Sequence, residues 1–204
     1  MPFSRRQMLA SIGLLGVGVL SSPVAMATQS RWPKKPPVPT DFNAEEYFVE
    51  LSEHGHGLVF GNPDAKAVVF MTFDTQCRWC VWQYQQFEPY LDRVKFVWHP
   101  VAVLNPWSEL QGAAILSAKD PQATFLKHEE HIQDPNFKGL DVRGMTLPFE
   151  AREAVWTNTK IFRRSGAREV PFGVLRQPDG RYIAVAEQTG DSFAKLAGSG
   201  LTHR

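Results

Sequence analysis

The run Lys66–Phe73, KAVVFMTF, constrains the fold most strongly because it is apolar and β-branched almost throughout. Such a run is typical of a strand that is buried on both faces of a sheet. A segment with helical spacing follows it, through Val81, Tyr84, Phe87 and Leu91. A second strand-like run then covers Lys95–Val103. Because a strand, helix, strand order pairs the two strands in parallel, we expect an α/β fold.

Both cysteines of the chain, Cys77 and Cys80, lie between the first strand and this helix. Unpaired backbone N–H groups and the helix dipole at a helix start stabilise a thiolate. Thiol pKa values at such positions fall from about 8.5 to roughly 3.5–7.5. We therefore predict Cys77 as nucleophile and Cys80, one turn inward and shielded, as the resolving thiol. Arg78 and Trp79, between them, are predicted to tune the redox pair, and Trp79 to face the substrate.

The residues alone do not exclude other uses of the two thiols. A disulfide that closes so small a ring constrains the unfolded chain little. A zinc site needs a second ligand pair, for which the candidates are His54 with His56 or His128 with His131. The second pair is flanked by charged residues, which predicts a solvated helix face. Copper binding by the thiols is the non-enzymatic alternative, a periplasmic copper carrier. Our prediction is a site with no metal and no cofactor.

Two further polar residues near the predicted strands have alternative roles. Asp74 follows the first strand, where it could accept a proton from a buried Cys80 or cap the turn before the helix. His99 ends an apolar run and is interpreted as a strand-end residue that could also tune a nearby thiolate.

Residues 1–27 have the pattern of a cleavable export signal. Arg5 and Arg6 precede an apolar run of about a dozen residues, which is shorter than the roughly 20 that a membrane-spanning helix needs. The segment ends in Ala25-Met26-Ala27, which suits cleavage after Ala27. The sequence around the arginines resembles a twin-arginine motif, although Sec signals also carry paired arginines.

The charge balance argues against a nucleic-acid or membrane-surface partner. Removal of the two signal arginines leaves 20 basic and 21 acidic side chains, from 22 and 21 in the whole chain. A nearly neutral protein has no strong attraction to polyanions. About 177 residues then remain, enough for one domain with an apolar core that does not depend on disulfides.

The rest of the chain is predicted to form two parts. Residues 28–62 form an N-terminal extension with a leader that carries four prolines at 31–40 and a short helix from Asp41. Residues 63–204 form the α/β domain, with a helical insertion at about 105–165. After the insertion, two strands joined by Pro178-Asp179-Gly180 predict an antiparallel hairpin, and a short helix ends the domain.

The motifs AVVFMTFDTQCRWC, GAAILSAKDPQATF and RSGAREVPFGVL together resemble the catalytic domain of the bacterial periplasmic disulfide isomerases DsbC and DsbG, with DsbG nearer. The resemblance covers about residues 63–198. It implies a thioredoxin-like fold with a helical insertion, and a cis peptide bond between Val170 and Pro171 that faces the cysteines. Val170 and Pro171 would then bind the substrate, the backbone of Val170 pairing with an extended chain.

Three features depart from this family. Arg78 stands where the family usually has proline, and Val170 where it commonly has threonine. Only about 35 residues precede Gly61 after the signal, fewer than the family's dimerisation domain, so we expect a monomer. A monomer would be open to an oxidising partner.

We therefore expect a periplasmic thiol:disulfide oxidoreductase that acts on exported proteins and is recycled by a membrane redox partner. A dithiol oxidase is favoured over a reductase, an isomerase or a sulfenic-acid reductase.

Overall fold

The computed structural model describes residues 37–198, and the predicted export signal lies outside them. Six α-helices and one 3-10 helix, η1 (Glu88–Tyr90), occur in this part of the chain. The α-helices are α1 (Ala44–His54), α2 (Arg78–Phe87), α3 (Pro106–Leu116), α4 (Pro121–His131), α5 (Phe149–Arg164) and α6 (Gly190–Ala197). The strands are β1 (Leu58–Gly61), β2 (Ala67–Asp74), β3 (Val94–Val101), β4 (Phe172–Arg176) and β5 (Tyr182–Ala186).

The five strands form one mixed sheet in the order β1-β3-β2-β4-β5. The central strands β2 and β3 are parallel, with Met71 opposite Trp98, whereas the other three pairs are antiparallel. Every residue of β2 is buried, which confirms the prediction from its continuous apolar run. The parallel pair and the α/β fold class are also as predicted.

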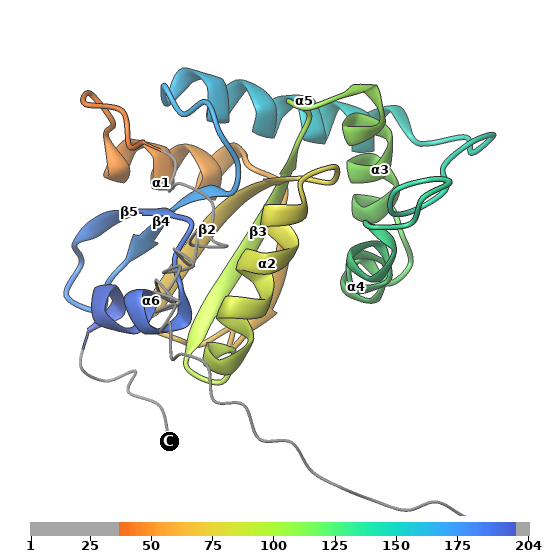
Figure 1. The fold of residues 1–204 in the computed structure, drawn as a ribbon. Helices are drawn as coiled ribbons and strands as arrows, with labels where there is room; N and C mark the ends of the chain where they lie inside the picture. The colour runs from red at the N-terminus through yellow and green to blue at the C-terminus, as the bar shows by residue number, and fades with distance from the viewer. Residues whose placement is uncertain (1–36, 199–204) are drawn as a thin grey trace, which may run out of the picture. The chain divides into compact units, whose positions relative to one another are not determined.

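Helices cover both faces of the sheet (Figure 1). On one face, Phe48 of α1 stacks on Phe70 with ring centroids 4.3 Å apart, and α5 lies beside α1. On the other face, Phe87 of α2 and Phe193 of α6 pack together over Phe96 of β3. Because the side chains of a strand alternate, β2 and β3 contribute to both apolar layers.

The predicted helical insertion contains helices with two different positions. The pair α3 and α4 lies beside the sheet (Figure 1), where α4 contacts the edge strand β1 and α3 contacts β3 and α5. By contrast, α5 packs on the sheet itself, where Asn158 donates to the carbonyl of Pro100 and Thr159 accepts from the amide of Ala102. Helix α5 is therefore a layer of the sandwich, and only α3, α4 and the loop after them extend it.

Two elements differ from the sequence prediction. The strand β1 was not predicted, since it is four residues long, follows Gly57 directly and ends on Gly61. The first helix begins three residues after Asp41, because Asn43 caps it by accepting the amide of Glu46 at 3.1 Å. The hairpin is as predicted, and Gly180 takes a positive φ of 88° in its turn.

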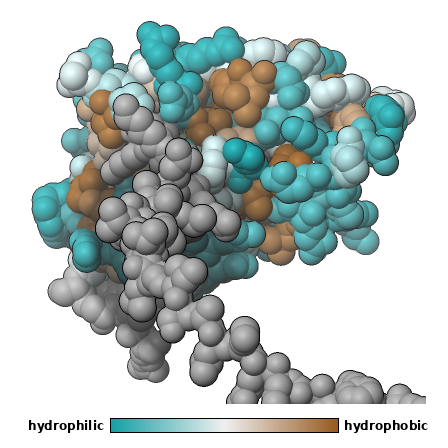
Figure 2. All heavy atoms as spheres, in the orientation of Figure 1, coloured by the Kyte–Doolittle hydropathy of each residue, from teal (hydrophilic) through white to brown (hydrophobic). Residues whose placement is uncertain are grey.

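Hydrophobic residues on the face drawn in Figure 2 form separate patches among hydrophilic ones. The most exposed large apolar side chains are Phe149, Met145 and Leu104, at 70%, 53% and 52% of full exposure. Between residues 37 and 198, no helix combines the length and the hydropathy that crossing a membrane requires.

Candidate functional site

The two cysteines lie at the start of α2, where the buried strand β2 ends. Cys77 is the N-cap residue of the helix, and its amide donates to the carbonyl of Asp74 at 2.9 Å to close the turn. The side chains of Cys77 and Cys80 are both free thiols, and the residues are 7% and 1% exposed. Cys77 is therefore the sulfur that a large reactant reaches first.

The surroundings shift the pKa values of the two thiols in opposite directions. A hydrogen bond from the Cys80 thiol lowers the pKa of Cys77, and the backbone N–H groups of Trp79 and Cys80 add to this effect. Burial raises the pKa of Cys80, and the neighbouring Cys77 sulfur raises it further. The helix start thus stabilises one thiolate while its neighbour stays protonated.

Val170 and Pro171 lie against the cysteine pair. The thiol of Cys77 donates to the carbonyl oxygen of Val170 at 3.4 Å, and the Val170–Pro171 peptide bond is cis. The segment comes directly before β4, which pairs with β2, so the sheet brings residue 170 next to residue 77.

A cavity of about 450 Å³ opens beside Cys77. Its lining includes Gln76, Arg78, Trp79, Leu104, Val170 and Glu187. The guanidinium of Arg78 lies over the ring of Trp79, 4.9 Å from its centroid. The structure therefore brings all six predicted site residues together, with Cys80 buried behind Cys77.

Asp74 holds the turn that carries the cysteines. One carboxylate oxygen accepts the amide of Gln76 at 2.9 Å and the hydroxyl of Ser108 at 2.6 Å. The other accepts the amides of Val103 and Leu104 at 2.8 and 3.0 Å. Burial raises the pKa of Asp74, and these hydrogen bonds oppose the rise. These four hydrogen bonds agree with the capping role of Asp74. They also attach the loop after β3 to the cysteine turn.

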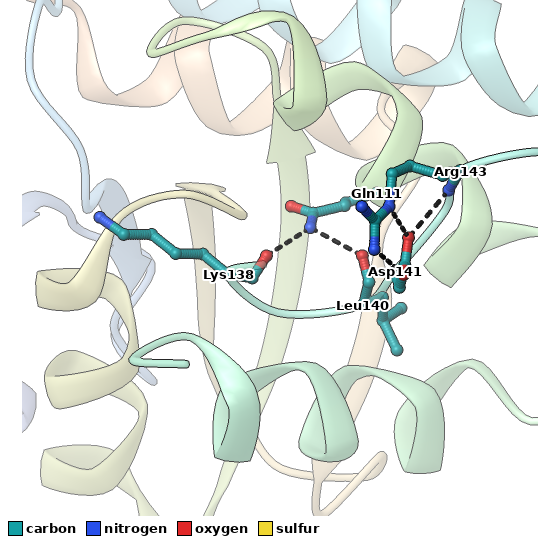
Figure 3. Close-up of polar contacts among 5 residues, drawn as sticks. All are labelled: Gln111, Lys138, Leu140, Asp141 and Arg143. Atoms are coloured by element: carbon teal, nitrogen blue, oxygen red, sulfur yellow. Dashed lines mark hydrogen bonds and ion pairs between the residues drawn. The ribbon is translucent and has the colours of Figure 1, made fainter. Parts of the chain in front are cut away.

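A second network of hydrogen bonds joins the turn that carries the cysteines to α3 and to the loop after α4. Gln76 donates to the side-chain oxygen of Gln111 at 2.6 Å. Gln111 in turn donates to the carbonyls of Lys138 and Leu140 at 2.6 and 2.9 Å, as Figure 3 shows. The loop after α4 is thereby fixed to α3, and the cysteine turn to both.

Of the histidines considered for a zinc site, His128 uses both ring nitrogens in hydrogen bonds within the fold. His128 is fully buried, and its two ring nitrogens bond the carbonyl of Thr75 at 2.7 Å and the amide of Leu140 at 3.1 Å. The predicted solvated helix face is therefore wrong for His128, because α4 docks this side chain on the cysteine turn. Within residues 37–198, no group of three or more His, Cys, Asp or Glu side chains is arranged to hold a metal ion.

His99 lies near the end of β3, two residues before Val101, and its side chain is buried. Its ring packs on Phe70 at 5.3 Å, on the face of the sheet that α1 covers. Burial lowers the pKa of His99 to about 4, so the ring is neutral at neutral pH.

Sequence reasoning missed two acidic residues near the cysteines. Glu187 lines the cavity, adopts a positive φ of 36°, and burial raises its pKa to about 7. Glu129 lies on α4, and burial raises its pKa to about 8, with a further rise from the charge of Cys77. No local pattern marked either residue, since both reach the site only through the packing of distant elements.

The sequence and the fold are similar to those of known thiol:disulfide interchange proteins. The thiol:disulfide interchange protein DsbG of Pseudomonas aeruginosa is 27% identical over 152 residues, which cover 72% of this chain and 57% of that protein. The DsbG of Escherichia coli is 35% identical over 79 residues, or 38% of this chain and 32% of that protein. The chain thus aligns with less than two thirds of either relative.

Among solved structures, a periplasmic thioredoxin-like protein from Salmonella enterica serovar Typhimurium superposes with a TM-score of 0.59 at 17% identity. The superposition covers 74% of this chain and 93% of that one. No family model matches the sequence. The predicted thioredoxin-like fold is confirmed.

Proposed function

We propose that this DsbG-like chain of thioredoxin-like fold is a thiol:disulfide oxidoreductase that works through Cys77 and Cys80. The single observation that carries the proposal is the placement of the two thiols at the start of α2, with Cys77 as the N-cap residue beside Val170 and Cys80 buried behind it. The opposite pKa shifts of the two thiols agree with this placement. A lowered pKa supplies thiolate, which is the attacking species in exchange. Cys80 is buried and protonated, which supports a second step in which Cys80 attacks only after Cys77 has reacted with the substrate.

The exchange follows from this arrangement. The Cys77 thiolate attacks a disulfide of the substrate, forms a mixed disulfide and releases one substrate thiolate. Cys80 then attacks the sulfur of Cys77, which breaks the bond to the substrate and closes the Cys77–Cys80 disulfide. In the oxidising direction the same bonds form and break in reverse order, and the substrate leaves with a disulfide.

The cavity beside Cys77 supports roles for four more residues. Val170 and Pro171 lie against Cys77 and would position an extended substrate chain, with the backbone of Val170 as a strand partner. Arg78 and Trp79 lie together at the mouth of the cavity, where they would contact the substrate and tune the redox pair.

Stabilisation of the Cys77 thiolate stabilises the reduced form, which favours a dithiol oxidase over a reductase, an isomerase or a sulfenic-acid reductase. An equilibrium potential near about −120 mV against glutathione would place the protein with strong oxidants, and one near about −270 mV with reductants. The export signal pattern supports a periplasmic location. Exported proteins would be the substrates there, and a membrane redox partner would recycle the pair.

Replacement of the resolving thiol tests this function. Cys80→Ser removes the second attack but leaves Cys77 as nucleophile, so mixed disulfides should accumulate. We expect incubation with a disulfide-bonded protein such as insulin to give a covalent adduct at Cys77 in near-stoichiometric yield, seen by non-reducing electrophoresis and mass spectrometry. The wild-type protein should show only a trace of it.

The double variant Cys77→Ser/Cys80→Ser is the matched control and should form no adduct. Adducts at Cys80 in the single variant Cys77→Ser, in the same yield, would contradict the assignment of the nucleophile. A wild-type protein that retains stoichiometric copper and exchanges no disulfides would instead be a copper carrier.

A further inference from the structure

Helix α4 lies alongside the segment that carries the cysteines. The ring of Phe125 on α4 meets the ring of Tyr84 on α2, with centroids 5.4 Å apart. Three residues later, His128 is hydrogen-bonded to the carbonyl of Thr75 at 2.7 Å. Since one residue of α4 contacts position 84 and a later one contacts position 75, α4 runs in the opposite direction to this segment.

This arrangement places Glu129 opposite Cys80. Glu129 follows Phe125 by four residues, so the two lie on one face of α4, one turn apart. Cys80 precedes Tyr84 by four residues and is likewise one turn away on α2. Both steps lead toward Thr75. In agreement with this placement, the charge of Glu129 raises the pKa of Cys80, and the charge of Cys77 raises the pKa of Glu129.

One oxygen of the Glu129 carboxyl group is unused by the fold. The Oε2 atom is shielded from solvent and has no hydrogen-bond partner among the described residues. A buried carboxylate without a partner is costly, and it favours the protonated form. The folded structure thus holds an unpartnered proton-binding oxygen within electrostatic range of a thiol that must lose its proton to react, and no hydrogen bond joins the two groups.

The other titratable groups around Glu129 are less suited to exchange a proton with Cys80, because of their pKa values, their hydrogen bonds or their exposure. Burial raises the pKa of Tyr84 to about 12 and lowers the pKa of His128 to about 4. Asp74 is occupied by four hydrogen-bond donors. The neighbours on α4, Lys127 and Glu130, are exposed. Among the groups that face α4, Glu129 is thus the acid left to exchange a proton near neutral pH, while Glu187, whose pKa burial raises to about 7, lines the cavity on the Cys77 side.

The charge of Cys77 makes the proton affinity of Glu129 depend on the stage of the reaction. While Cys77 is a thiolate, repulsion between the two negative charges favours a protonated Glu129. When Cys77 is joined to a substrate, its charge is gone and the repulsion ends. Glu129 then loses its proton more readily and becomes an acceptor at the stage when Cys80 has to be deprotonated.

We propose that Glu129 is a catalytic residue that accepts the proton of the Cys80 thiol as Cys80 attacks the mixed disulfide. The proposal rests on the exchange function proposed above. The proton moves from Cys80 through one bridging water molecule to a carboxylate oxygen of Glu129, since no hydrogen bond joins the two groups directly, and the new thiolate attacks the Cys77 sulfur. The bond between Cys77 and the substrate breaks, and its electron pair leaves on the substrate thiolate. The protein is oxidised to the Cys77–Cys80 disulfide and the substrate is reduced. In the oxidising direction, Glu129 returns the proton to Cys80.

Reaction of the reduced full chain with the aromatic disulfide DTNB separates the two steps. Attack by Cys77 releases the first coloured thiolate, and attack by Cys80 releases the second. In Glu129→Gln we expect the second release to be slowed about 100-fold at neutral pH, as for loss of a positioned proton acceptor. The first release should stay within a few-fold of wild type, and the defect should shrink as pH rises. Glu130→Gln, an exposed neighbour on the same helix, should behave as wild type.

An unchanged second release in a folded Glu129→Gln variant would overturn the proposal, and so would an equal defect in Glu130→Gln. The wild-type protein gives a test that needs no variant. Its second release should level off with rising pH below the range where a buried thiol ionises by itself; a tenfold rise per pH unit throughout would contradict the role of Glu129. Absence of the first release would instead contradict the proposed function, which keeps the two failures distinct.

Discussion

Cys77→Ser is expected to reduce disulfide exchange to the uncatalysed rate in an insulin reduction or RNase reoxidation assay. A serine hydroxyl at this position remains protonated, whereas the Cys77 thiol loses its proton readily. Cys80 cannot replace it, because that sulfur is 1% exposed and burial keeps its pKa high.

The fold should tolerate this substitution. Cys77 is the N-cap of α2 but makes no capping hydrogen bond with its side chain, and serine is a preferred N-cap residue. The urea midpoint of Cys77→Ser should therefore equal or exceed that of the wild type, which separates lost chemistry from lost structure. Exchange at the wild-type rate in this variant would remove Cys77 from the mechanism.

Asp74→Ala is expected to give the largest loss of stability. The substitution leaves the amides of Gln76, Val103 and Leu104 without their acceptor beneath a buried turn. Each unsatisfied buried group costs about 1–3 kcal/mol, so we expect the free energy of unfolding to fall by about 3 kcal/mol or more. Urea denaturation monitored by circular dichroism measures this loss.

Asp64→Ala is the matched control, because Asp64 is exposed and its loss should cost less than about 0.5 kcal/mol. Asp74→Asn keeps one acceptor oxygen but turns a donor toward backbone amides, so it should also be destabilising. If Asp74→Asn kept full stability and slowed only the Cys80 step, Asp74 would be the proton acceptor in place of a structural anchor.

The sequence predicted those parts of the molecule that depend on local pattern. The apolar run at 66–73 indicated a strand buried on both faces, observed as β2 at 67–74, and the order of elements indicated the parallel pair. The position of Cys77 at a helix start follows from the same two elements. The cap of the first helix was not predicted correctly: α1 is capped by Asn43, whereas the sequence placed its start at Asp41.

Features that depend on long-range packing were not predictable from local pattern. KHEEH at 127–131 has the composition of a solvated helix face, yet α4 docks on the cysteine turn and buries His128. Glu129 gains its raised pKa from that docking. Asp74 was recognised as a cap, but its bonds to Ser108, Val103 and Leu104 join segments about 30 residues apart. Strand β1 was missed because four residues carry too little periodicity.

The pH dependence of alkylation at each cysteine tests the central claim most directly, since the whole account depends on two thiols of unequal acidity. Reduced protein would be treated with iodoacetamide from about pH 5 to about pH 9, and modification at each cysteine followed by peptide mass spectrometry. We predict that Cys77 reacts with a midpoint below about pH 7.5, in the range of activated thiols, while Cys80 stays unmodified in the folded protein. A Cys77 midpoint near about pH 8.5, the value of an ordinary thiol, or equal rates at both sulfurs would contradict the account.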